Sequence, residues 1–309
     1  MDFLQKFIHR LEVAGGMRYL RSAALVLAVL MLAVAYNFRG FKNMNTLEAM
    51  DAAQLARNVS EGKGYTTLFI RPLSMYLVKK RNQETKAVPT VGEVADFSQL
   101  RTPHPDLANP PVYPVVLAGL MKALPFRYPL PEKTQAFWNL RGNFWRYQPD
   151  FLIAVFNQVL LLIAVAMVFF LARRLFDRSV AWLSALLMLG TDLLWRFSVS
   201  GLSTMLLLVI FLGLAWCLIV FEEENREPRG GMGRLFLLAA FAGLLTGVGG
   251  LTRYAFGWMI VPVAVFVLLI SSRRAVLLSL VSLLMFAAVL TPWIIRNLNV
   301  SRSEERRVG

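Results

Sequence analysis

Seven long apolar stretches constrain this chain more than any other feature of its sequence. Each runs for about 16 to 22 residues with at most one charged side chain, and a helix needs about this length to cross a hydrocarbon core of roughly 30 Å. A helix satisfies its own backbone hydrogen bonds in lipid, so helix is the expected structure of all seven. With 57% hydrophobic residues, the sequence predicts an all-α polytopic membrane protein. The stretches are Leu20–Tyr36, Phe151–Ala172, Val180–Trp195, Val199–Val220, Leu235–Leu251, Tyr254–Ile270 and Ala275–Ile295.

The distribution of Lys and Arg between these stretches predicts the orientation of the chain. Basic residues gather in the N-terminal segment and in the loops after the second, fourth and sixth stretches, whereas the alternate short connections hold one Arg each. The N-terminus is therefore expected in the cytoplasm and the first long loop outside. The expected parts are 1–19, a cytoplasmic amphipathic segment; 20–36, the first transmembrane helix; 37–150, a large external loop; 151–296, transmembrane helices two to seven; and 297–309, an abrupt tail.

The two ends of the chain call for separate interpretation. Ala33-Val34-Ala35 resembles a signal-peptide cleavage site, but the basic region before it is long and carries apolar residues at helical spacing. An uncleaved anchor is the favoured interpretation. The polar ending resembles vector read-through, so the tail is expected not to be native and the chain to be an N-terminal fragment.

Charge and cysteine content exclude some classes of function. The formal net charge is +14, but the basic residues are dispersed among loops that flank membrane helices, which favours contacts with membrane lipids over nucleic-acid binding. The single cysteine, Cys217, can form no intrachain disulfide. His9 and His104 fall on opposite sides of the membrane in this topology, so no histidine-rich metal cluster is expected. No cofactor is implied, and a divalent metal is not supported.

The external loop begins with an acidic helix. The segment Asn45–Val59 has a cap at Thr46 or Asn45, acids in its first turns, and a stop at Gly62 and Gly64. Glu48 and Asp51 are three residues apart, so both side chains are expected on one face. The helix dipole also stabilises acids at this position, so their presence there does not by itself require a function. The later segment Pro111–Leu124 is short for a membrane span, so we expect an interfacial or re-entrant helix.

Three short motifs follow one another in this loop. They are Ala56-Arg57, then Gly62-Lys63-Gly64-Tyr65, then Asn109-Pro110-Pro111-Val112-Tyr113. Their order resembles the GT-C class of membrane glycosyltransferases, in particular bacterial relatives of the dolichyl-phosphate-mannose–protein mannosyltransferases and of the lipid A aminoarabinose transferase. Aligning Ala56-Arg57 with the family's Ala-Arg places Glu48 at the position of the catalytic acid.

The chain departs from that pattern in two places. The family's acid pair is reduced to Glu48 followed by Ala49, with Asp51 one turn later, so both Glu48 and Asp51 stay candidates for the catalytic base. Some relatives also carry an acid at the start of the fourth span, where this chain has Ser200-Gly201-Leu202-Ser203-Thr204. The nearest acid is Asp192, which we expect to pair with Arg196 at i,i+4 spacing.

Cationic and polar residues supply the expected substrate contacts. Arg253, in Leu251-Thr252-Arg253-Tyr254, matches a Leu-Thr-Arg of relatives and offers a planar fork to phosphate oxygens. An Arg at this place can also simply extend to the membrane interface. The other substrate-binding candidates are Tyr113, His104, Asn109, Arg71 and Arg296.

The resemblance implies a glycosyltransferase that moves a sugar from a polyprenyl-phosphate carrier to a lipid, glycan or protein acceptor, with inversion, on the external face of a bacterial inner membrane. The alternatives are a transporter or flippase of a lipid-linked sugar and a non-catalytic assembly subunit.

Overall fold

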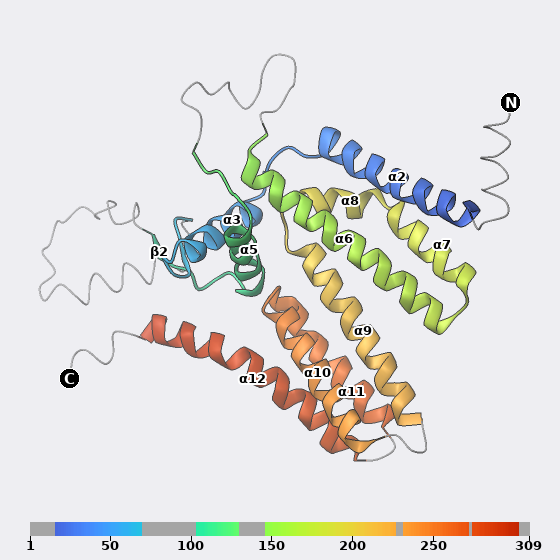
Figure 1. Ribbon diagram of the computed structural model, residues 1–309. Coiled ribbons are helices and arrows are strands. Elements are labelled where there is room, and N and C mark those ends of the chain that lie inside the picture. The colour runs from blue at the N-terminus through green and yellow to red at the C-terminus, as the bar shows by residue number, and fades with distance from the viewer. Residues whose placement is uncertain (1–15, 70–102, 130–145, 227–230, 272–273, 303–309) are drawn as a thin grey trace, which may run out of the picture.

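The computed structural model of the chain describes residues 16–69, 103–129, 146–226, 231–271 and 274–302 (Figure 1). The expected amphipathic segment before residue 16, the last residues of the tail and Arg71 lie outside these ranges. The part of the chain that is described is almost entirely helical, as the sequence predicts.

All seven apolar stretches are helical over most of their length. Within the described ranges, four helices are long and apolar enough to span a membrane, and a fifth span results if a bent pair is counted as one. The expected count of seven is thus not confirmed. The helices are α2 (Gly16–Arg39), α6 (Gln148–Leu175), α7 (Arg178–Leu189), α8 (Asp192–Val199), α9 (Thr204–Arg226), α10 (Met232–Gly250), η2 (Tyr254–Met259), α11 (Ile260–Ile270) and α12 (Ala275–Arg302), of which α6, α9, α10 and α12 are the four.

The third expected span is two helices, α7 and α8, bent by 54°. The bend lies at Gly190 and Thr191, where the hydroxyl of Thr191 donates to the carbonyl of Leu187 at 2.8 Å and Asp192 begins the first turn of α8. The fourth span begins at Thr204 rather than Val199, because Gly201 has φ +77° and interrupts the helix. A side chain at this position would also come within 2.8 Å of Met44 Cε.

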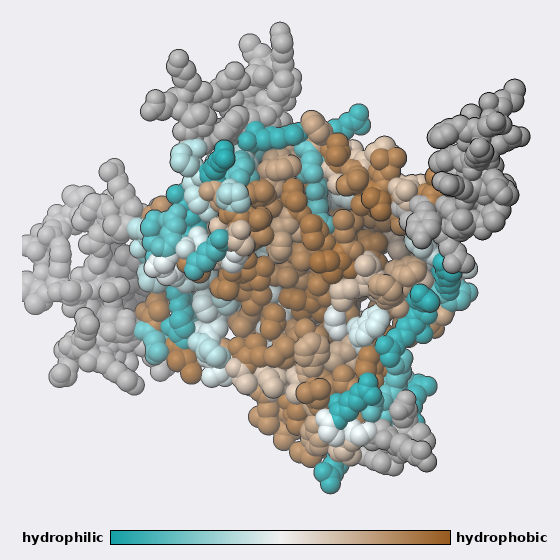
Figure 2. All heavy atoms as spheres, viewed as in Figure 1, coloured by the Kyte–Doolittle hydropathy of each residue, from teal (hydrophilic) through white to brown (hydrophobic). Residues whose placement is uncertain are grey.

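An apolar belt crosses the molecule between two polar ends. Figure 2 shows hydrophobic residues over the middle of the visible face and hydrophilic residues at the end that carries α3 and α5, and again along the opposite edge. This distribution is that of a protein whose helices face lipid. Inside the bundle, Gly243 and Gly247 of α10 let α12 approach closely, since an added Cβ would lie 2.1 Å from the Ser282 carbonyl oxygen and 2.8 Å from Val289 Cβ.

The first loop forms a small polar cap at one end of the bundle. It contains α3 (Leu47–Ser60), β1 (Thr66–Thr67), β2 (His104–Pro105) and α5 (Val112–Ala123), and the two strands pair antiparallel with Thr67 opposite His104. Ala49 and Ala56 of α3 pack with Tyr113 and Leu117 of α5 in one apolar cluster. Figure 1 shows this cap beside the end of α10 and the starts of α6 and α9, so it covers the end of the membrane bundle.

Candidate functional site

A cavity of about 350 Å³ lies between the polar cap and the bundle. This volume falls within the range of about 300–1,000 Å³ that is usual for small-molecule sites. Residues from four separate segments line it, among them the acidic helix, the Pro-Pro-x-Tyr motif and the Leu-Thr-Arg motif. They are Glu48, Ala52, Ala108, Asn109, Pro110, Tyr113, Pro114, Gly201, Leu202, Ser203, Thr252, Arg253, Tyr254 and Ala255.

Glu48 belongs to the cavity because of how α3 begins. Thr46 is the N-cap, as predicted, and its hydroxyl accepts from the Ala49 N–H at 3.3 Å. Glu48 thus lies in the first turn, where a carboxylate is stabilised by the helix dipole. Its side chain is exposed and lines the cavity. This acid is open to a ligand.

Asp51 is in a different environment from Glu48. It is fully buried, and its two carboxylate oxygens accept from the Thr67 hydroxyl at 2.6 Å and from the Asn109 amide at 2.7 Å. Hydrogen bonds to a buried charge contribute about 1.5–3 kcal/mol each. Asp51 therefore joins α3 to β1 and to the wall of the cavity, and it is not among the residues that line the cavity.

A second buried acid, Asp106, shapes the turn that carries Asn109. Its carboxylate accepts from the N–H groups of Ala108 and Asn109 at 3.2 and 2.9 Å. The Tyr65 hydroxyl donates to the carbonyls of Asn109 and Pro110 at 3.2 and 3.1 Å. Burial raises the pKa of this hydroxyl, so Tyr65 stays neutral and keeps its donor. The turn is held from both sides.

Tyr113 anchors the start of α5 to the bundle. It is buried, its hydroxyl donates to the Gly201 carbonyl at 2.8 Å, and the same oxygen accepts from the Asn157 amide at 3.0 Å. Its hydrogen-bonding capacity is used inside the protein, while its ring forms part of the cavity wall. Tyr113 thereby joins the Pro-Pro-x-Tyr motif to the turn before α9.

The Leu-Thr-Arg motif lies directly beside that segment. The Val112 N–H donates to the Leu251 carbonyl at 3.0 Å, which fixes the start of α5 on the end of α10. Two residues later, Arg253 is the N-cap of η2 and is exposed on the cavity. Within the described ranges its guanidinium has no hydrogen bond or ion pair. A cation without an internal partner is available for an anionic ligand.

Arg296 makes its contacts with the polar cap. Its guanidinium donates to the carbonyls of Asp106 at 2.5 Å and Tyr65 at 3.2 Å, and it lies over the ring of Trp293 at 4.9 Å. Since these carbonyls belong to the cap, Arg296 fastens α12 to the turn that carries Asn109. It does not line the cavity.

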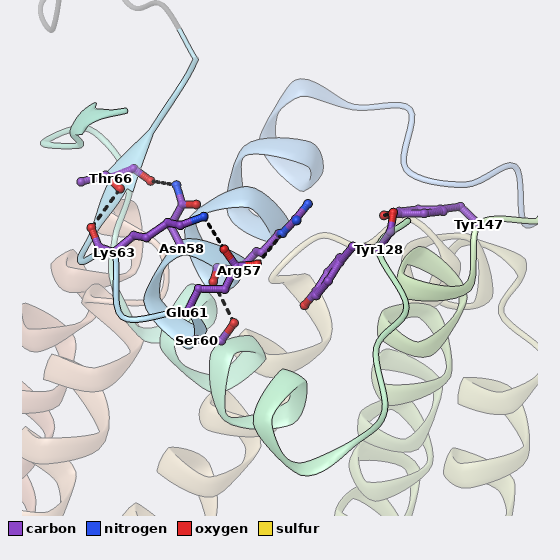
Figure 3. A network of polar contacts seen from close by, with 8 residues as sticks. All are labelled: Arg57, Asn58, Ser60, Glu61, Lys63, Thr66, Tyr128 and Tyr147. Carbon is purple, nitrogen blue, oxygen red and sulfur yellow. Dashed lines mark hydrogen bonds and ion pairs between the residues drawn. The ribbon is translucent and has the colours of Figure 1, made fainter. Parts of the chain in front are cut away.

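A network of polar contacts, shown in Figure 3, surrounds the C-terminal end of α3. Arg57 donates to Glu61 at 2.8 Å and lies over the Tyr128 ring at 4.1 Å, and Lys63 also reaches Glu61 at 2.5 Å. The hydrogen bond from Arg57, then that from Lys63, lowers the pKa of Glu61. Asn58 is buried and donates to the Thr66 carbonyl at 2.6 Å. Gly62 and Gly64, each with φ +76°, allow this turn.

The remaining predicted residues fall elsewhere. His104 is buried on β2, and its Nε2 has no hydrogen-bond partner in the part of the chain that is described. It is not in the cavity lining. Asp192 and Arg196 form the expected ion pair, with 2.6 Å between Oδ2 and Nε. Among the described residues, no group of three or more His, Cys, Asp or Glu side chains is placed to hold a metal ion.

Sequence reasoning did not identify three residues that organise this site. They are Thr67, Asp106 and Asn157, each of which is fully buried. Thr67 bonds Asp51, which precedes the cavity residue Ala52; Asp106 bonds the cavity residue Asn109, and Asn157 bonds the cavity residue Tyr113. Only Asp106 left a local signal, because an Asp side chain commonly accepts from backbone N–H groups two and three residues later and so forms a turn.

The comparison with protein families covers the membrane helices and the Leu-Thr-Arg motif. Residues 146–295 match the family model of dolichyl-phosphate-mannose-protein mannosyltransferase. No curated protein and no solved structure matches the chain.

The match runs from the start of α6 into α12 and includes Arg253, while Glu48 and the rest of the polar cap precede it. It covers slightly less than half of the chain. Together with the apolar helices, it indicates an integral membrane protein that is similar to mannosyltransferases and supports a glycosyltransferase activity in general.

Proposed function

We propose that the chain transfers a sugar from a polyprenyl-phosphate carrier to an acceptor hydroxyl in the cavity beneath the polar cap. One observation carries this proposal: an exposed acid, Glu48, and a cation, Arg253, that has no partner among the described residues line the same cavity, although about two hundred residues separate them. A transfer of this kind needs a base for the acceptor and a positive charge for the leaving phosphate.

Glu48 is the proposed general base. Its carboxylate takes the proton of the acceptor hydroxyl as that oxygen attacks the anomeric carbon. The bond between this carbon and the phosphate oxygen breaks, and its electron pair stays on the phosphate. A single displacement inverts the anomeric configuration. Base assistance of this kind contributes roughly 10²–10⁴ in rate.

Arg253 is the proposed phosphate-binding residue. Its guanidinium offers two parallel N–H donors to phosphate oxygens and stabilises the charge that remains on the carrier. Its position at the junction of α10 and η2 is near the end of the apolar bundle, so a lipid-linked phosphate would reach it without leaving the membrane surface. We assign this end to the external side, because the basic loops flank the opposite ends of the helices.

Substitution of Arg253 tests the phosphate role with polyprenyl phosphate itself as the probe. Arg253→Ala should weaken binding of polyprenyl phosphate by about tenfold or more, because a charge-assisted bidentate contact is lost. Arg253→Lys should restore only part of it, since a point charge replaces the fork. Arg127→Gln, which removes an exposed cation outside the cavity, is the matched control. Normal binding by Arg253→Ala would reject this assignment.

A second assay separates transfer from transport. The purified full-length protein is reconstituted into vesicles with a polyprenyl-phosphate sugar labelled in the sugar, and membranes supply the acceptor. Transferase activity moves the label off the carrier. Label that crosses the bilayer while still attached to its carrier would instead indicate a flippase.

A further inference from the structure

A second cavity, of about 710 Å³, lies on the other side of the turn that joins α8 to α9. Ser200 lines this second cavity and Gly201, the next residue, lines the proposed transferase site. The two cavities are thus adjacent, and no described residue lines both of them. The second one is formed by the end of α2, the segment that follows it, and α8; its lining is Ala35, Tyr36, Arg39, Gly40, Lys42, Asn43, Asn45, Asp192, Arg196, Val199 and Ser200.

The charges of this cavity favour an anionic ligand. Among the described residues, three basic side chains line it, Arg39, Lys42 and Arg196, against a single acidic one, Asp192. The carboxylate of Asp192 already has partners inside the protein: it pairs with Arg196 and accepts from the Tyr36 hydroxyl at 2.6 Å. Arg39 is exposed and has no ion pair or hydrogen bond within the described part of the chain. A surplus of positive charge therefore surrounds the cavity.

The apolar surroundings of the cavity favour a ligand with acyl chains. Arg39 is the last residue of α2, so the cavity lies where an apolar helix ends. On α2, Leu30, Met31 and Val34 precede it with exposed fractions of 56%, 59% and 53%, and on α8 Leu193 is 58% exposed. A cationic rim above an exposed apolar helix face is the arrangement that binds an anionic lipid headgroup with its chains alongside.

Aromatic packing fixes the wall of the cavity that contains Tyr36. The rings of Tyr36 and Trp195 are stacked with centroids 5.3 Å apart, and the Trp195 indole donates to the Leu189 carbonyl at 2.7 Å. These contacts fix α8 against α2, and Arg39 at the end of α2 and Arg196 on α8 both line the cavity. We infer that this cavity binds the phosphate headgroup of an anionic phospholipid of the surrounding membrane, separately from the sugar donor.

The test measures binding of short-chain phosphatidylglycerol to the purified full-length protein, with short-chain phosphatidylcholine as the neutral lipid and glycerol phosphate as the headgroup alone. Phosphatidylglycerol should bind, and the other two should bind much more weakly. Equal binding of phosphatidylcholine would show that charge is not recognised and would overturn the proposal. Equal binding of glycerol phosphate would overturn the lipid assignment in favour of a soluble phosphate.

Charge substitutions of opposite sign locate the site. Arg39→Gln and Arg196→Gln should each weaken phosphatidylglycerol binding by about fivefold, the effect of one basic residue at a lipid surface. Asp192→Asn should strengthen it, because it removes the one acid among the described lining residues and frees Arg196. A general loss of structure cannot produce this improvement. The control Arg127→Gln removes an exposed cation that does not line the cavity and should leave binding unchanged.

The outcome is independent of the proposed transferase reaction. Arg39→Gln should leave polyprenyl-phosphate binding unchanged, whereas Arg253→Ala should leave phosphatidylglycerol binding unchanged. Loss of polyprenyl-phosphate binding in Arg39→Gln would make this cavity part of the donor site and overturn the proposal. An equal loss of phosphatidylglycerol binding in Arg127→Gln would mean that the lipid responds only to the overall charge of the protein, and would overturn the proposed site.

Discussion

Glu48 and Asp51 lie one turn apart on α3, yet their carboxylates have different surroundings. Glu48 is exposed on the cavity, whereas Asp51 is buried with two short hydrogen bonds, from Thr67 and Asn109. A base must reach the proton of its substrate, so exposure favours Glu48. A buried, fully bonded acid is better suited to holding Asn109 in the cavity wall.

Substituting Asp51 tests this division of roles. Asp51→Asn keeps the shape but replaces a charged acceptor, so stability should fall by about 1–3 kcal/mol. The loss is measured as a lower midpoint of thermal unfolding in detergent. Glu48→Gln is the matched control, because it changes an exposed carboxyl and should alter stability by no more than about 0.5 kcal/mol. An Asp51→Asn protein with wild-type stability and no activity would instead make Asp51 the base.

At the scale of elements, the length of the apolar stretches predicted the helices well, because each long apolar stretch can only be helical in lipid. The breaks were predicted less well. The bend between α7 and α8 depends on Gly190 and Thr191, and that before α9 on the positive φ of Gly201. Glycine in an apolar run is compatible with both a continuous helix and a break, so tertiary packing decides.

Arg296 gives a prediction at this scale. Because it binds two carbonyls of the cap, Arg296→Gln should loosen the segments around Tyr65 and Asp106, and amide hydrogen exchange there should become faster. Arg296→Lys should protect them only in part, since an ammonium lacks the fork. Arg274→Gln, at the opposite end of α12, is the control. Unchanged exchange in Arg296→Gln would remove its positioning role and return it to the candidates for direct substrate contact.

At the scale of the whole molecule, the order of the motifs predicted which segments lie around one cavity, but not their contacts. Glu48, Asn109, Tyr113 and Arg253 do meet at one cavity. The buried residues that hold them, Thr67 and Asp106, could not be found in this way. The role of a buried polar residue depends on hydrogen-bond partners that the sequence alone does not identify. His104 shows the converse, since a prominent motif residue is buried away from the cavity.

The orientation of the molecule is tested by cysteine accessibility in intact cells. Native Cys217 is buried and should not react. Arg127→Cys, in the exposed part of the polar cap, should react with an impermeant thiol reagent, whereas Arg178→Cys, exposed at the start of α7, should react only after the membrane is opened. Labelling of Arg178→Cys alone in intact cells would reverse the topology.

The central claim is that Glu48 removes the acceptor proton, and its most direct test is the rate of sugar transfer by Glu48→Gln. With the full-length protein and a labelled polyprenyl-phosphate sugar, turnover should fall by roughly 10²-fold or more, because the base is lost. Binding of polyprenyl phosphate, which depends on Arg253, should stay close to that of the wild type. Wild-type turnover in Glu48→Gln would contradict the account.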